Sequence, residues 1–111
     1  VSDYTMALKQ QPDSAIAINS LAWLLSTCPD ERFRDGKRAL ELARKGNDIN
    51  PGAYTLDTLA AAYAENGNFE KAVATQKEVL RLLENKADAP LIRECKRHLE
   101  AYEERVPWRE R

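Results

Sequence analysis

The stretch Asn19-Ser-Leu-Ala-Trp-Leu-Leu25 is echoed further along the chain by Asp57-Thr-Leu-Ala-Ala-Ala-Tyr63. Each stretch opens with a small polar pair, continues with Leu-Ala and ends in a large apolar residue. The matched pairs are all 38 residues apart: Leu21 and Leu59, Ala22 and Ala60, Leu25 and Tyr63. Two segments that share the order and size of their side chains indicate an internal repeat of one structural unit.

The apolar residues within this echo have helical spacing. Ile18, Leu21, Ala22 and Leu25 recur at intervals of three and four, and no segment alternates with the period of two that is typical of a half-buried strand. Turn-forming residues divide the chain into six segments, so the sequence predicts an all-α fold. The predicted helices span residues 2–10, 14–27, 36–48, 53–66, 69–85 and 89–104.

Residues suited to capping helices stand at the predicted boundaries. Asp13, Asp35, Asn68 and Asp88 each precede a helix, where a side-chain oxygen can accept hydrogen bonds from backbone N–H groups without a partner. Gly67 is suited to the left-handed conformation that closes the helix before it. Since each cap contributes about 1 kcal/mol, we expect these residues to fix where the helices stop.

The second helix of each unit reveals a difference between the two units. Ala39 and Ala72 are 33 residues apart, five fewer than the matched pairs of the first helices, and the extra residues fall between positions 27 and 35. The first unit is therefore predicted to carry an enlarged turn. Tyr4 precedes Pro12 by eight residues, as Ala43 precedes Pro51, so the N-terminal segment reads as the second half of a truncated unit.

Units of about 34 residues with the pattern W-x2-L-G-x2-Y, then A-x3-F, then P, are the signature of tetratricopeptide repeats. This sequence resembles that family over about residues 4–86. The matching positions are Ile18, Leu21, Ala22, Leu25, Ala39, Ala43 and Pro51 in the first unit, and Leu56, Leu59, Ala60, Tyr63, Gly67 and Ala72 in the second. The sequence departs from the pattern at Gln76, where an aromatic residue is usual, and at Glu84, where proline is usual.

The resemblance implies a right-handed α-α superhelix of helical hairpins, closed by a C-terminal capping helix. Residues 1–12 would be the second helix of a preceding repeat, 13–51 a repeat with an enlarged turn, 52–86 a second repeat, and 87–111 the cap and tail. Because the chain begins at Val1 inside a predicted helix, we expect it to be the C-terminal part of a larger protein.

Side-chain size gives this pattern a physical basis. Ala22 with Ala39, and Ala60 with Ala72, are small where the two helices of a unit are expected to cross, while larger side chains fill the space between units. The last predicted helix has an inward stripe and a solvated face. The stripe comprises Leu91, Ile92, Cys95, Leu99 and Tyr102, and the solvated face Arg93, Arg97, Glu100, Glu103 and Glu104.

Composition narrows the classes of function. With 17 Lys and Arg against 18 Asp and Glu, the net charge is −1, so nucleic acid is not expected as a ligand. The densest apolar run, residues 21–25, is far shorter than the roughly 20 residues of a membrane span, which predicts no membrane insertion. No secretory signal is evident and the two cysteines form no framework, so we expect a cytoplasmic protein.

The sequence offers little for catalysis or metal binding. Cys95 and His98 are three residues apart on one predicted helix, a spacing that suits two metal ligands, but no further Cys or His offers a third. Cys28 with His98 as a base would make a nucleophile pair, yet nothing local activates the thiol and we expect the two in different layers. We therefore expect no metal, no cofactor and no enzyme activity.

The remaining candidate for a functional site is a concave surface. In proteins of this family the first helix of each repeat lines that surface, which usually binds peptides or partner helices. The residues predicted to face it are Ile16, Asn19, Trp23, Ser26, Tyr54, Asp57, Ala61, Ala64 and Glu65, with Arg93 and Arg97 at its border. Trp23 is either a binding anchor or part of the core, and Asn19 and Asp57 either hold a partner's backbone or are solvated. Partner-binding residues are predicted to be Asn19, Trp23, Tyr54, Asp57, Arg93 and Arg97.

The leading hypothesis is a non-catalytic module that binds a protein or peptide in this groove. The alternatives are self-association through the N-terminal helix, around Tyr4, or a regulatory appendage of an upstream enzyme. Some members of this family use a lysine on this surface to bind the C-terminal carboxylate of a partner. This sequence has no lysine at the matching positions, which argues against that activity. The segment Val106-Pro-Trp-Arg-Glu-Arg111 is either a lid folded over the last helix or a free recognition motif.

Overall fold

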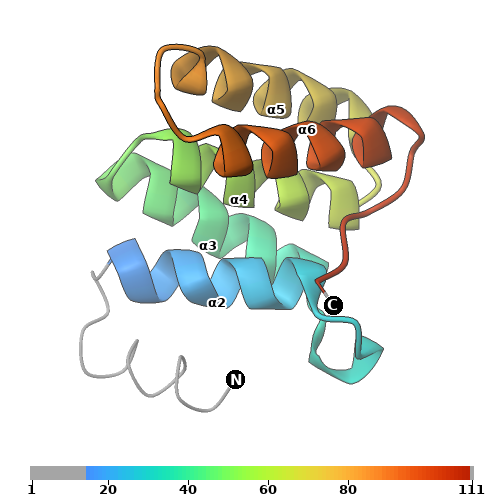
Figure 1. Ribbon diagram of the computed structural model, residues 1–111. Helices are drawn as coiled ribbons and strands as arrows, with labels where there is room; N and C mark the ends of the chain where they lie inside the picture. The colour runs from blue at the N-terminus through green and yellow to red at the C-terminus, as the bar shows by residue number, and fades with distance from the viewer. Residues whose placement is uncertain (1–14, 111) are drawn as a thin grey trace.

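The computed structural model describes residues 15–110, and within this range the fold consists of helices joined by loops, with no strands (Figure 1). The helices are α2 (Ala15–Thr27), α3 (Gly36–Ile49), α4 (Ala53–Glu65), α5 (Phe69–Leu83) and α6 (Ala89–Glu103), with a short 3-10 helix η1 (Glu31–Phe33). Each helix agrees with its predicted range to within two residues. The predicted helix 2–10, which contains Tyr4, lies outside the described residues. So does Asp13, the predicted cap of the helix that follows.

The predicted caps stand at three helix starts. Asp35 accepts a hydrogen bond from the backbone N–H of Arg38 at the start of α3, and Asn68 accepts one from Lys71 at the start of α5. Asp88 does the same for α6. Gly67 has a φ of 79°, the left-handed conformation expected at the end of α4. Local side-chain chemistry therefore determines these boundaries, as predicted.

The enlarged turn between α2 and α3 is held by its own hydrogen bonds. Asp30 caps η1 by accepting from the backbone N–H of Arg32. The guanidinium of Arg34 donates to the carbonyl of Cys28 at 2.7 Å and lies 3.5 Å from Glu65 of α4. The inserted residues thus form an ordered loop that is tied to the second hairpin.

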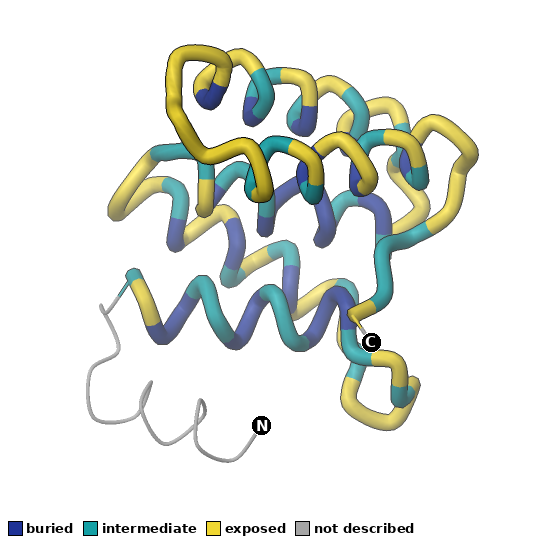
Figure 2. The backbone as a smooth tube through the Cα atoms, in the orientation of Figure 1, coloured by how far each residue is buried: buried dark blue, intermediate teal, exposed yellow. Residues whose placement is uncertain are grey.

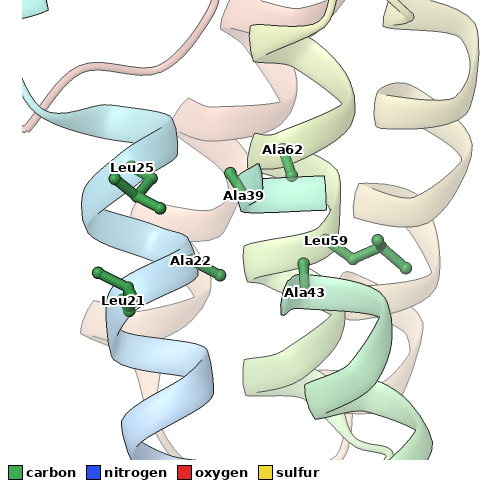
Figure 3. Packing of buried hydrophobic residues seen from close by; sticks show 7 residues of the cluster. All are labelled: Leu21, Ala22, Leu25, Ala39, Ala43, Leu59 and Ala62. Atoms are coloured by element: carbon green, nitrogen blue, oxygen red, sulfur yellow. The ribbon is translucent and has the colours of Figure 1, made fainter. Parts of the chain in front are cut away.

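The helices pack in chain order, each against the one before it, and α2 also packs beside α4 (Figure 1). The two Leu-Ala segments meet in one core cluster, which contains Leu21, Ala22, Leu25, Ala39, Ala43, Leu59 and Ala62 (Figure 3). Buried residues follow the faces where helices meet, while the loop between α5 and α6 is exposed (Figure 2). The echo in the sequence therefore corresponds to neighbouring helices that share a core.

The predicted small-residue contacts occur in these cores. Ala22 and Ala39 belong to the cluster between α2, α3 and α4, and Ala60 and Ala72 belong to a second cluster that Tyr102 of α6 completes. All four alanines are fully buried. Because they present only a methyl group, the helix backbones can approach closely at these levels.

Gly46 is a buried glycine in α3 that faces Ile18 of α2. A Cβ placed there would lie 3.5 Å from Cγ2 of Ile18, an ordinary van der Waals distance. Since glycine in a helix costs about 0.5–1 kcal/mol relative to alanine, we expect Gly46→Ala to raise the free energy of unfolding by a similar amount. Thermal unfolding would measure this, with Gly46→Leu as the contrast that overpacks the contact and lowers stability by about 1–3 kcal/mol. A lower melting temperature for Gly46→Ala would contradict the expectation.

Candidate functional site

A cavity of about 350 Å³ lies between α2, α4 and α6. Four of the six predicted partner-binding residues line it, namely Asn19 and Trp23 from α2 and Tyr54 and Asp57 from α4. The other lining residues are Ser20, Thr58, Leu91, Glu94, Cys95, His98 and Glu110. The antiparallel packing of α2, α3 and α4 brings the first helices of the two hairpins side by side, which is why residues 19–23 and 54–58 share one wall.

A second cavity of about 250 Å³ adjoins the first, with which it shares Asn19, Ser20 and Tyr54. Its lining includes Ile16, which is 81% exposed, and Tyr54, which is 68% exposed. Together the two cavities form a groove along α2 and α4. One end of this groove presents exposed apolar side chains and the other end presents carboxylates.

The predicted border residues Arg93 and Arg97 do not line either cavity. Both are exposed on α6. The guanidinium of Arg97 donates to Glu94 at 3.1 Å and lies 5.5 Å from the ring centroid of Trp108. The structure therefore separates these two arginines from the four residues that it brings together.

Gln76 of α5 contacts two residues that line the groove, Asp57 and Cys95. Its side chain is fully buried, and its Nε2 donates to Oδ1 of Asp57 at 2.9 Å and to the carbonyl of Cys95 at 3.1 Å. One amide thus ties α5 to both α4 and α6. This explains the departure from the repeat pattern, because an aromatic ring at position 76 would make neither hydrogen bond.

His98 lies against the same carboxylate and is almost fully buried. Its Nδ1 is 3.1 Å from Oδ1 of Asp57, and its Nε2 is 3.4 Å from Oε1 of Glu94. The rings of Trp23 and Trp108 contact the imidazole, with centroids at 5.5 Å and 4.4 Å. The predicted inward stripe of α6 omitted His98, which lies between the stripe residues Cys95 and Tyr102.

Cys95 is buried beside this histidine. Its burial, followed by the negative charges of Asp57 and Glu94, raises the pKa of the thiol to about 12. A thiol held in its neutral form is a poor nucleophile at neutral pH. Cys28 does not line either cavity, so the pairing of Cys28 with His98 finds no support in the lining of the groove.

The segment after α6 folds back toward α2 (Figure 1). The backbone N–H of Glu110 donates to the carbonyl of Thr27 at 2.9 Å, and the carboxylate of Glu110 accepts from Nε1 of Trp23 at 2.9 Å. Arg109 pairs with Glu65 of α4 at 2.8 Å. Of the two interpretations of this tail, the lid describes its position, and the lid reaches beyond α6 to α2 and α4.

Three residues expected to face the groove, Ser26, Ala61 and Ala64, are buried. The carbonyl of Ser26 accepts from Arg109, and Ala64 packs in the cluster with Tyr102 and Trp108. The tail and the C-terminal part of α6 therefore close one end of the predicted groove. The helical period predicted that these three residues face the groove, but it could not show that other parts of the chain pack over Ser26 and Ala64.

Within residues 15–110, no helix combines the length and the apolar character needed to cross a membrane. Comparison of the sequence and the structure with family models, curated proteins and solved structures found no match, so the geometry of the groove carries the functional argument.

Proposed function

We propose that this chain is a non-catalytic protein-interaction module of the tetratricopeptide type, which binds an extended peptide of a partner protein in the groove along α2 and α4. The chain-order packing of antiparallel helices supports this proposal, as does the contact of α2 with α4, because stacked hairpins leave a shared surface formed by their first helices. A right-handed superhelical course of the hairpins is part of the proposal.

The observation that carries the proposal is the lining of the groove. Trp23 and Tyr54 offer aromatic surface, and Asp57, Glu94 and Glu110 offer three carboxylates, while no lysine or arginine among residues 15–110 lines either cavity. A basic side chain would find both opposite charge and aromatic faces there. Exposed Ile16 and Tyr54 would cover an apolar neighbour of that side chain.

The chain's own tail supports binding of extended backbone on this surface. Residues 106–110 have no helical or strand structure, and the N–H of Glu110 pairs with the carbonyl of Thr27 at the end of α2. A partner peptide lying further along α2 would meet Asn19 and Asp57, whose polar side chains suit hydrogen bonds to its backbone. We therefore propose a peptide that carries Lys or Arg next to an aliphatic residue.

A positional-scanning library of short labelled peptides, measured by fluorescence anisotropy with a chelator present, tests this function. We expect selection of Lys or Arg beside Leu, Ile or Val. Tyr54→Ala should weaken the binding of the selected peptide at least tenfold, since aromatic anchors dominate such interfaces. Tyr54 is well suited to this test because its side chain is exposed, so its removal leaves the core packing intact.

Phe33→Ala is the matched control, because Phe33 is an exposed aromatic residue of η1 outside both cavities. It should leave the affinity unchanged. Equal weakening by both substitutions, or a library that selects acidic peptides, would reject the proposed groove.

A further inference from the structure

We propose that Asp57, Cys95 and His98 form a binding site for Zn²⁺. A carboxylate oxygen of Asp57, Sγ of Cys95 and a ring nitrogen of His98 all lie within 4.8 Å of one another. Carboxylate, thiolate and imidazole are the protein donors that bind zinc, and Zn²⁺ would displace the proton of the buried Cys95 thiol on binding. The sequence alone supplied only the pair on α6, and the packing of α4 against α5 and α6 supplies the third donor.

The distances between the donors suit a small tetrahedral ion. Zinc bonds of about 2.0–2.3 Å place neighbouring ligand atoms roughly 3.3–3.8 Å apart. The Nδ1 of His98 and the Oδ1 of Asp57 are already 3.1 Å apart. Cys95 and His98 come from successive turns of one rigid helix, so adjustments of about 1 Å in side-chain position would complete the three-ligand set.

The surroundings of these donors resemble the outer shell that orients metal ligands. Gln76 donates to Asp57 and fixes the orientation of its carboxylate. With Nδ1 directed at a metal, Nε2 of His98 carries the proton and faces Oε1 of Glu94 at 3.4 Å, an arrangement in which a carboxylate supports a ligating histidine. In the absence of a metal, the buried Nε2 makes no well-formed hydrogen bond within the described residues.

The adjoining cavity provides room for a fourth ligand. Cys95, His98 and Asp57 all line the cavity of about 350 Å³, so a water molecule or another small donor can reach the open position. Zinc sites with three protein ligands hold a water molecule or another small molecule in the fourth position. The site does not depend on the proposed peptide, although a basic side chain and Zn²⁺ would exclude each other because both would use Asp57.

Titration of the reduced, metal-free chain with Co²⁺, a spectroscopic substitute for zinc, tests the site directly. We expect one equivalent to bind with a thiolate-to-metal charge-transfer band in the near ultraviolet, and Zn²⁺ to displace it. Cys95→Ser should abolish this band. Cys28→Ser, which removes the other cysteine and does not touch the site, should retain it.

Two further variants separate a metal site from a structural hydrogen bond. Asp57→Asn keeps the acceptor for Gln76 and should lower the affinity for Zn²⁺ at least tenfold. Glu94→Gln changes a half-buried side chain outside the core and should lower it about 10–100-fold, the usual effect of losing an outer-shell partner. These measurements contain no peptide, so their outcome is independent of the peptide assay.

The absence of a charge-transfer band in the unmodified chain would overturn the proposal, and the Asp57–His98 contact would then be a structural hydrogen bond only. Persistence of the band in Cys95→Ser, or its loss in Cys28→Ser, would overturn it equally. Far-UV circular dichroism in the presence of chelator checks that each variant is folded, and Glu94→Gln keeps the test decisive if Cys95→Ser is unstable.

Discussion

Replacing Tyr102 with alanine is expected to lower the free energy of unfolding by about 3–5 kcal/mol, the usual cost of removing a buried aromatic ring. Tyr102 has no exposed surface and is the largest fully buried side chain among the described residues. It packs against Ala60, Ala64 and Ala72. These methyl groups cannot extend into the space that the ring would leave, so the cavity would remain open.

Tyr102→Phe is the matched control, because it keeps the ring and removes only the hydroxyl. That hydroxyl is buried and has no hydrogen-bond partner within residues 15–110. Removing a polar atom without a partner is close to neutral or stabilising, so we expect a change of less than about 1 kcal/mol. Urea denaturation followed by circular dichroism would measure both variants, and equal losses would show that the ring is not the stabilising group.

The stability of the unmodified chain and that of Tyr102→Phe should differ in alkaline solution. Burial, followed by the negative charge of Asp57, raises the pKa of Tyr102 above its ordinary value of 10.0. The unfolded chain therefore loses this proton at a lower pH than the folded chain, and stability falls as the pH rises above about 10. Tyr102→Phe lacks this group, so the unmodified chain should lose more stability above pH 10 than the variant.

Leu59→Ala is expected to cost about 2–5 kcal/mol, the range measured for buried leucine-to-alanine changes. Leu59 is 8% exposed and belongs to the core cluster shared by the two hairpins (Figure 3). Small domains are stable by about 5–15 kcal/mol in total, so this single change would remove a large part of the margin and would weaken the contact between the hairpins.

Leu82→Ala provides the control for Leu59→Ala, because it makes the same chemical change at a residue of α5 that is 36% exposed. A surface substitution of this kind is expected to change stability by about 0.5 kcal/mol or less. Chemical denaturation of both variants measures the difference. A cost at position 82 that matches the cost at position 59 would mean that the shared cluster is not the source of stability.

The helices and their ends could be predicted from the sequence because their causes are local. Apolar residues at intervals of three and four determine the helical faces, and Asp35, Asn68 and Asp88 each cap a helix through backbone groups within a few residues. Gly67 adopts the left-handed conformation for an equally local reason. The alanine contacts were also predictable, because Ala22 and Ala60 match in the first helices of the two units, and Ala39 and Ala72 match in the second helices.

The candidate site was only partly predictable. The helical period identified Asn19, Trp23, Tyr54 and Asp57, all of which line one cavity. It did not predict that Gln76 would bridge Asp57 and the backbone of Cys95. The only sequence signal for that bridge was a glutamine at a position where the repeat pattern favours an aromatic residue.

The sequence by itself determined that this protein is helical, where the helices stop and which of their faces are apolar, because these properties depend on neighbouring residues and on a fixed period. Only the tertiary structure decided that His98 and Cys95 meet Asp57, and that the tail covers Ser26 and Ala64. Contacts of this kind depend on how distant helices rotate and pack against each other. That rotation is set by the volumes of many buried side chains at once, which no single spacing in the sequence encodes.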